Sequence, residues 1–63
     1  MFTRCFERTT YNIFTNADTY QVINISEYGF EFYMDNEFES AGLVEDLDEI
    51  IEMLLDEGWE EVL

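Results

Sequence analysis

The chain has 63 residues, and its 16 acidic residues against two basic ones give a formal net charge of −14 at pH 7. Hydrophobic residues make up 48% of the chain and aromatic residues 17%. This excludes an acidic disordered chain, because such chains lack aromatic and branched aliphatic side chains. One cysteine, no histidine and no lysine exclude an internal disulfide, a thiolate metal site and the usual general bases of enzymes. We expect a single domain over residues 1–63 that is not an enzyme, holds no metal or cofactor, and works in the reducing cytoplasm.

The charge is unevenly distributed along the chain. The only two cations are Arg4 and Arg8, and two acids balance them within the first 26 residues. The other 14 acids (16 − 2) lie from Glu27 onward, and no basic residue stands among them. Charge of one sign repels itself and destabilises the compact state, so this distribution indicates a role outside folding.

The first two-thirds of the chain is predicted to form strands, because Thr, Tyr, Ile, Phe and Val dominate it. Turn signals at Asn16-Ala17-Asp18 and Glu27-Tyr28-Gly29 divide it. The strands are expected at about 3–15, 19–27 and 30–36. The short turns between them predict antiparallel pairing.

The first predicted strand has no single hydrophobic alternation. Phe2 and Phe6 fall on one parity, and Tyr11 and Ile13 fall on the other. We therefore expect a bulge or break near residues 8–10, which would bring both pairs onto one face.

The third predicted strand alternates cleanly at period two. Its hydrophobic face carries Phe30, Phe32 and Met34. Its other face carries Glu31, Tyr33 and Asp35. The pattern predicts one face buried in a core and one acidic face in solvent.

From residue 43 the apolar spacing changes from two to three and four, which indicates one face of a helix. The stripe consists of Leu43, Val44, Leu47, Ile50, Ile51, Leu54 and Leu55. Asp46 followed by Glu49 fits a capping box, so the helix is predicted to begin at residue 46. A start near Ser40 is the alternative, against which Gly42 argues. Gly58 suits the position just past the helix end.

The predicted fold is therefore α+β. It is a three-stranded antiparallel sheet with one C-terminal amphipathic helix, residues 46–57, packed on one face. Residues 59–63 are expected either to add a short final strand or to remain irregular. The helix must cover the strand face that carries Phe30 and Phe32, so the acidic strand face points away from it.

The predicted helix carries a row of acids. Over 12 residues, or roughly 18 Å at 1.5 Å per residue, six acids give one charge per about 3 Å, close to the about 3.4 Å of one DNA strand. The six are Asp46, Asp48, Glu49, Glu52, Asp56 and Glu57, with Glu45 just before them. Like-charge pairs at i,i+3 and i,i+4 would cost roughly 1–2 kcal/mol of helix stability. These residues are the first candidates for a partner-binding surface.

A second candidate surface lies on the strand face that points away from the helix. It consists of Glu31, Asp35 and Tyr33. These residues can share one partner with the helix acids or act alone, and the sequence does not choose. An aromatic residue within an acidic surround, such as Tyr33, is typical of residues that dominate interface energies, and it is equally typical of packing.

Two ordinary explanations compete with a partner. A run of acids is commonly a solvated face, but interspersed lysines would serve that purpose better because i,i+4 pairs with glutamate stabilise a helix. Adaptation to high salt would also acidify residues 1–26, which are neutral. Without a basic patch the chain is not expected to bind nucleic acid, and without a long apolar run it is not expected to enter a membrane. The pattern favours a module that binds the basic, nucleic-acid-binding surface of another protein.

In its size, its lysine-free acidic stretch from Glu27 to Glu61 and its acidic helix, the chain resembles small phage-encoded inhibitors that mimic DNA, including anti-CRISPR and anti-restriction proteins. The resemblance is to a functional class of diverse folds. It implies that the protein, as a monomer or dimer, blocks DNA binding by a CRISPR effector or restriction enzyme in the host cytoplasm. Two alternatives remain open: an immunity protein or antitoxin against a basic toxin nuclease, and a structural subunit that oligomerises through an open sheet face or strand edge.

Overall fold

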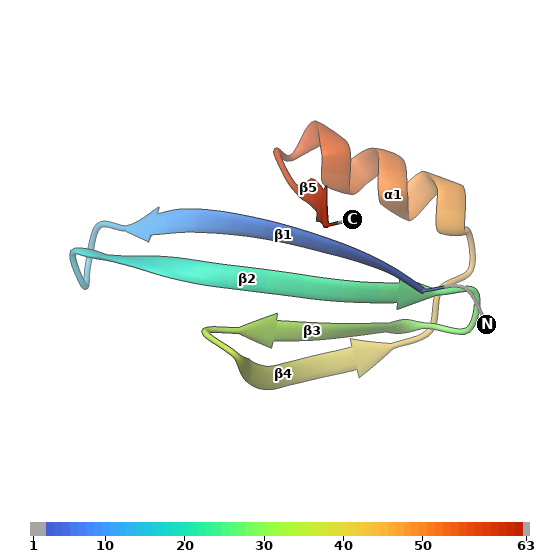
Figure 1. Ribbon diagram of the computed structural model, residues 1–63, viewed down its shortest axis with the longest axis horizontal. Coiled ribbons are helices and arrows are strands. Elements are labelled where there is room, and N and C mark those ends of the chain that lie inside the picture. Colours follow the sequence, from blue (N-terminus) through green and yellow to red (C-terminus); the bar gives the residue numbers. More distant parts are fainter. Residues whose placement is uncertain (1–2, 63) are drawn as a thin grey trace.

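One helix lies on one face of a five-stranded antiparallel sheet (Figure 1), in a computed structural model that describes residues 3–62. The elements are β1 (Thr3–Asn12), β2 (Ala17–Ser26), β3 (Phe30–Met34), β4 (Glu37–Gly42), α1 (Leu47–Asp56) and β5 (Glu60–Val62). The strand order is β4-β3-β2-β1-β5. The predicted α+β class with one helix is confirmed, and the sheet has more strands than predicted.

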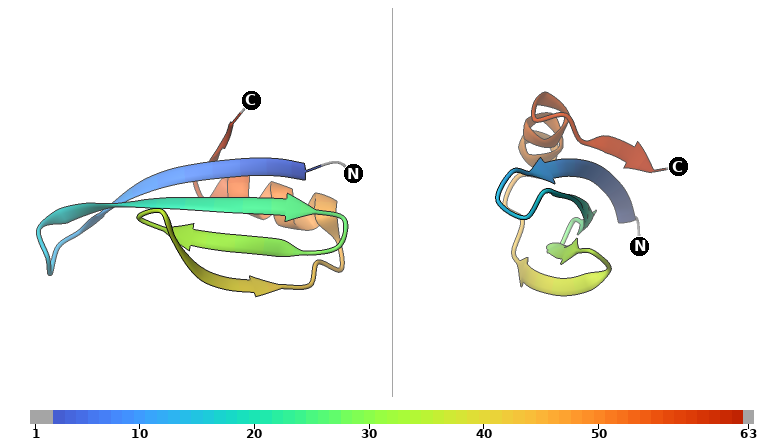
Figure 2. Two further views of the ribbon diagram at one scale, coloured as in Figure 1. Left: turned by 60° about the horizontal axis from the view of Figure 1, so that its bottom comes forward. Right: turned by 90° about the vertical axis from the view of Figure 1, so that its left-hand side faces the viewer.

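The chain builds the sheet in two stages. Strands β1 to β4 form a meander of hairpins, and α1 then carries the chain from one outer strand to the other. There β5 pairs with β1, with Phe6 opposite Glu61. This confirms the final strand over Glu60–Val62, whereas Leu63 lies outside the described residues. Figure 2 shows the helix over one face of the sheet, while nothing in the described chain covers the other face.

The hydrophobic core lies between α1 and the sheet. Its buried residues are Phe6, Ile25, Ile51, Leu54 and Trp59. Phe30 and Phe32 pack against this cluster, as the alternation of β3 predicted. Met34, predicted to share their face, is half-buried and lies outside the cluster. The core is therefore small, and each of its side chains carries a large share of a marginal stability.

The helix ends follow the sequence signals. The side chain of Asp46 accepts a hydrogen bond from the backbone N of Glu49 at 3.2 Å, and Gly58 has φ of 90°, a value that favours glycine. Two members of the predicted apolar stripe are exposed, namely Leu43 at 87% and Leu55 at 54%. Leu43 precedes the helix in a loop, and Leu55 lies on the flank of its last turns, so neither reaches the sheet.

Strand β4 was not predicted, and its turn explains why. Asp35 and Asn36 both have positive φ, 51° and 67°, as in the tight type I′ hairpin turn. The hydrophobic alternation instead predicts a third strand that continues through these two residues, with Asp35 on its solvent face. The alternative helix start near Ser40 is also wrong, because Ser40 lies in β4. A register shift between Phe32 and Tyr33 marks a bulge in the pairing of β3 with β4.

Strand β1 is regular where a break was expected. Ten consecutive residues, Thr3 to Asn12, pair with β2, and the turn falls at residues 13–16 instead of 16–18. The change of parity has another cause, because Tyr11 and Ile13 lie beyond the core and face no buried layer. Phe2, which the same prediction used, lies outside the described residues.

Residues 9–19 form a protruding ribbon at the far end of the molecule (Figure 1, left). β5 pairs with β1 only as far as Glu7, and β3 pairs with β2 only from Gln21. Within the described chain, the two strands of the ribbon therefore have ladder partners only in each other. The molecule is elongated as a result, with extents of 37 × 23 × 21 Å.

Candidate interaction surface

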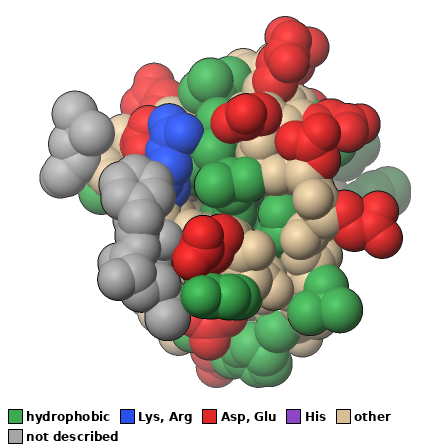
Figure 3. Space-filling view, turned by 90° about the vertical axis from the view of Figure 1, so that its right-hand side faces the viewer, with side chains coloured by type: hydrophobic (Ala, Val, Ile, Leu, Met, Phe, Trp, Pro, Cys, Tyr) green, Lys and Arg blue, Asp and Glu red, His purple; other side chains and the backbone are tan. Residues whose placement is uncertain are grey.

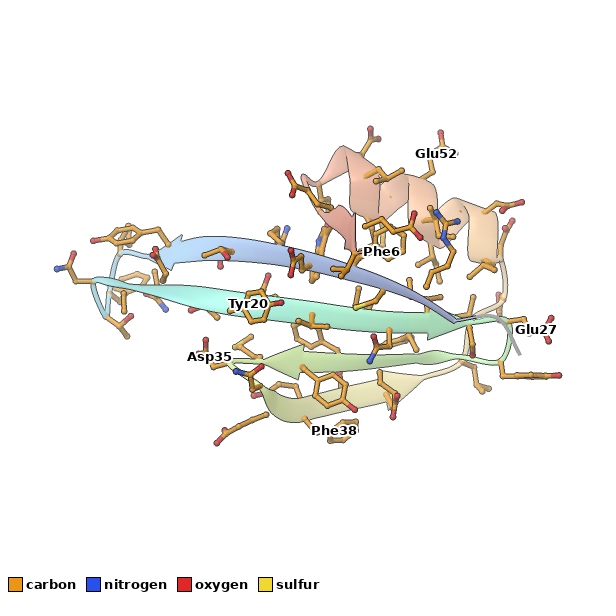
Figure 4. The ribbon with its side chains drawn as sticks, viewed as in Figure 1. Phe6, Tyr20, Glu27, Asp35, Phe38 and Glu52 are labelled. Carbon is orange, nitrogen blue, oxygen red and sulfur yellow. The ribbon has the colours of Figure 1, made fainter. Side chains whose placement is uncertain are left out.

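The predicted helix acids lie on the outer side of the molecule. Asp48, Glu49, Glu52 and Asp56 on α1 and Glu45 before it are all exposed. Figure 4 shows Glu52 on the side of α1 that points away from the sheet. Because the apolar side of α1 faces the core, its polar positions are forced outward, and they are almost all acidic.

Two of the predicted helix acids have roles within the fold. Asp46 caps the helix through Glu49 N. Glu57 lies 4.0 Å from the guanidinium of Arg8 through its carboxylate, and its carbonyl oxygen accepts a hydrogen bond of 3.4 Å from the same Arg8 group. In residues 3–62, the remaining five side chains have no hydrogen bond or ion pair. We call them the unpaired row: Glu45, Asp48, Glu49, Glu52 and Asp56.

Both arginines are engaged in contacts within the fold, Arg4 between neighbouring strands β1 and β5 and Arg8 between the sheet and the end of α1. Arg4 donates two hydrogen bonds to Glu61 of β5, from Nε at 2.7 Å and from Nη2 at 2.5 Å. The hydrogen bond from Arg4 holds the pKa of Glu61 below its ordinary value, and the pKa of Arg4 is raised in turn. Arg8 lies over the ring of Trp59, 4.5 Å from its centroid, and donates to Gln21 at 3.0 Å. The two arginines thus pair with Glu57 and Glu61 and with no member of the unpaired row, although the charge of Asp48 contributes to the raised pKa of Arg4.

At the start of the helix the acids surround a hollow of about 370 Å³. Three carboxylates, those of Glu45, Asp46 and Glu49, line it together with the apolar side chains of Leu43 and Ile50. This combination suits a lysine or arginine side chain, whose charged end pairs with carboxylates while its aliphatic stem lies on apolar surface. Figure 3 shows this end of the molecule, with acidic side chains around apolar ones and basic side chains confined to one spot.

The second candidate surface is divided by the structure. Glu31 is opposite Ala41 and Tyr33 is opposite Phe38, so both lie on the open face of the sheet. Tyr33 is half-buried and its ring packs edge-on against Phe38, with centroids 5.8 Å apart, so it is partly a packing residue. The helix acids and Glu31 lie on opposite layers, as expected, and no single flat contact covers both.

Asp35 has a structural role that the sequence analysis missed. It lies in the β3–β4 turn, where its carboxylate accepts a hydrogen bond from the backbone N of Tyr20 at 3.0 Å. Its own N donates to the carbonyl oxygen of Tyr20 at 2.7 Å. Asp35 therefore closes the end of the β2–β3 ladder, and we withdraw it from the primary binding surface.

The open face carries acids that the sequence analysis did not select. Glu7 and Glu60 are directly opposite each other on β1 and β5, and like charges in this position destabilise a sheet. Glu7 accepts a hydrogen bond of 2.5 Å from the hydroxyl of Tyr20, which raises the pKa of that tyrosine. Only the final strand brings Glu60 to Glu7, so their proximity has no local signal in the sequence.

Three other kinds of feature bear on what the described residues can do: a metal site, a reactive thiol and a membrane-spanning helix. Within residues 3–62, no three or more Cys, Asp or Glu side chains are arranged to hold a metal ion. Cys5 is a free thiol whose pKa is raised, mainly by burial, which makes it a poor nucleophile. Among the described residues, no helix has the length and apolar composition needed to cross a membrane.

The comparisons with known proteins give no relative from which a function can be transferred. The chain matches no protein-family model, no curated protein and no solved structure at a significant level. Any functional conclusion therefore rests on the residues themselves.

Proposed function

We propose that the protein is a DNA-mimicking inhibitor that binds the basic DNA-binding surface of a host defence complex, either a CRISPR effector or a restriction enzyme. The observation that carries this proposal is the unpaired row. Its five acids stand exposed along one helix and its entry, while both arginines of the chain are held elsewhere. The acids would occupy positions that normally receive DNA phosphates.

The charge of the chain supports rapid association with such a surface. Opposite fields over extended surfaces steer two proteins together and make the association rate fall with ionic strength. The hollow formed by Glu45, Asp46 and Glu49 supplies a place for one basic side chain of the partner. Contact through α1 leaves the core untouched, because all five members of the row are exposed and none belongs to the core.

The proposal is tested by competition against labelled DNA. A panel of purified type I and type II CRISPR effectors, a type I restriction enzyme and a basic toxin nuclease is incubated with its DNA and increasing amounts of the protein. We expect DNA to be displaced from a CRISPR effector or the restriction enzyme, with an affinity that falls as NaCl is raised. Displacement from the toxin nuclease alone would favour an immunity protein, and a DNA band shifted by the pure protein would contradict mimicry.

Charge reversal then locates the contact. The triple variant Asp48→Lys/Glu49→Lys/Glu52→Lys should lose at least about 100-fold in affinity, because close charge pairs across an interface contribute about 1.5 kcal/mol or more each. The matched control Glu27→Lys/Glu31→Lys/Glu37→Lys changes the net charge equally but lies off the helix. The reverse outcome, in which only the control loses binding, would assign the contact to the sheet layer.

A further inference from the structure

The tip of the protruding ribbon exposes large apolar side chains. Phe14 is 93% exposed, Ile13 75% and Tyr11 57%. None belongs to the core cluster, and the helix covers none of them. A contiguous exposed patch of this kind on a small protein marks an interaction site more often than a single exposed residue does.

The tip has a defined conformation. The side-chain oxygen of Asn12 accepts hydrogen bonds from the backbone N of Phe14 at 2.9 Å and of Thr15 at 3.3 Å. Asn16 N donates to the carbonyl oxygen of Asn12 at 2.8 Å, and the hydroxyl of Tyr11 donates to the Asn16 side chain. A tip held in this way loses little conformational freedom when another surface packs against it.

The ribbon has few of the features that protect free strand edges. Both of its edges are without ladder partners in the described chain, and natural proteins usually guard such edges with charges or proline. Over residues 9–19 the sequence has no proline and a single charged residue, the exposed Asp18 opposite Tyr11, although the chain as a whole carries −14. This is the part of the molecule that a second acidic molecule can approach with least repulsion.

The tip carries a hollow beside the projecting side chain. The hollow is shallow, with a volume of about 340 Å³, and its wall is formed by ribbon side chains that include Phe14, by Gln21 of β2 and by Met34 of β3. It lies next to the most exposed residue, Phe14, so a projection and a recess occur on the same small surface. Such a surface allows a two-fold contact in which each copy places its Phe14 against the recess of the other.

We propose that the ribbon tip is an interface for a second copy of this chain, in a two-fold tip-to-tip dimer anchored by Phe14 and Ile13. In this arrangement the acidic layers point away from each other along the long axis, and at physiological salt charges more than about 8 Å apart are largely screened. The unpaired row stays exposed on both copies. The dimer therefore does not rest on the proposed function, and it is compatible with it.

The exposed area sets the expected strength of the dimer. Fully buried aromatic side chains bury about 150–250 Å² each, so the three tip residues offer on the order of 400 Å² per copy and about 800 Å² in total. Stable complexes bury about 1,200–2,000 Å². The dimer is therefore weak and forms at high protein concentration.

Sedimentation equilibrium tests the proposal with the protein alone. Over a concentration series from micromolar to millimolar, the average mass should rise from 7.6 kDa towards twice that value. The rise should be steeper in high NaCl, because salt screens the repulsion between two copies. This dependence on salt is opposite in sign to that expected for a basic partner, so failure of one proposal is distinguishable from failure of the other.

Variants locate the contact. Phe14→Ser and, separately, Ile13→Ser should each abolish the concentration dependence, and thermal melts establish that both remain folded. The matched control is Leu43→Ser, which removes an 87% exposed apolar residue outside the ribbon and should still dimerise. A mass of 7.6 kDa at all concentrations and salts would overturn the proposal. So would a dimer that survives both tip variants, or one that is lost in Leu43→Ser or in Phe38→Ser on the open face.

Discussion

The acidic layer of α1 and the protruding ribbon of β1 and β2 are opposites within one small chain. The helix and its entry expose five acids that have no ion-paired partner in residues 3–62, and the ribbon exposes apolar side chains with Asp18 as its one charged residue. Each works against the isolated molecule, the first through repulsion and the second through contact of apolar surface with water. The difference teaches that the two regions should respond to salt in opposite directions: we expect salt to weaken binding of the proposed basic partner to the helix and to strengthen the proposed contact between two ribbon tips.

The largest expected effect is on the free energy of unfolding, which should differ between a variant of a core phenylalanine and a variant of a ribbon phenylalanine. Phe6 is fully buried, whereas Phe14 is 93% exposed. Phe6→Ala should reduce the free energy of unfolding by about 3–5 kcal/mol, comparable to the roughly 3–9 kcal/mol expected for a domain of this size. Phe14→Ala should change it by less than about 0.5 kcal/mol. Urea denaturation measures both, and similar losses in the two variants would mean that the ribbon is part of the core.

The next effect concerns the cation that joins the helix end to the sheet. Arg8→Met keeps an extended side chain but removes the hydrogen bonds to Gln21 and Glu57 and the contact with the Trp59 ring. A cation over an aromatic ring contributes about 0.5–2 kcal/mol. We expect a loss of about 1–2 kcal/mol in thermal or urea denaturation. The control Gln21→Met removes only the hydrogen bond to Gln21. A loss as large in the control would show that the stacking on Trp59 contributes nothing.

Salt should act on the stability of the monomer through the helix acids and not through the ribbon. Raising NaCl should increase the melting temperature by on the order of 5 °C, because it screens repulsion among the helix acids that amounts to roughly 1–2 kcal/mol. Asp48→Asn/Glu52→Gln should reduce this increase, and Phe14→Ser should leave it unchanged when melts are run at low protein concentration. A melting temperature that stays constant or falls with salt would contradict the account of the charge.

The smallest effect is a pH dependence at the contact between β1 and β5. The pKa of Glu61 is lowered by its hydrogen bonds from Arg4, so its stabilising contribution is present above the ordinary glutamate pKa of about 4.3. It is lost as the pH falls through the lowered value in the folded state. Glu61→Gln should therefore lose less stability than the native chain over that range. Melts from neutral to acidic pH measure the difference, and identical profiles would show that the pair contributes no pH dependence.

Local patterns in the sequence predicted those parts of the fold that local physics determines. The capping residue Asp46, the position of Gly58 and the alternation of Phe30 and Phe32 each follow from neighbours a few residues away. Strand β4 was not predicted because the chain turns at Asp35, which has a positive φ. In the sequence, Asp35 continues the alternation of the preceding strand, so the hydrophobic period alone predicts one longer strand.

The remaining errors arise where a residue lies far from the core or far from its neighbour in sequence. Tyr11 and Ile13 are residue types common in buried strands, but nothing in the described chain covers the ribbon. The side of the strand on which they lie therefore does not indicate a buried face. The proximity of Glu7 and Glu60 depends on a pairing across nearly the whole chain. The helix acids could be selected from sequence, but the engagement of Glu57 by an arginine could not.

The pairing of β5 with β1 has a kinetic consequence. It joins residues 57 positions apart at the Arg4–Glu61 contact, whereas the pairings within the β1–β4 meander are between consecutive strands. Closing so long a loop costs more chain entropy than any other pairing step in folding, and only the three residues of β5 form this pairing. We expect the pairing of β5 with β1 to form last and open first, while α1 remains packed on the sheet through Ile51 and Leu54. Amide hydrogen exchange would then show the amides of β5 exchanging ahead of those of β2 and β3.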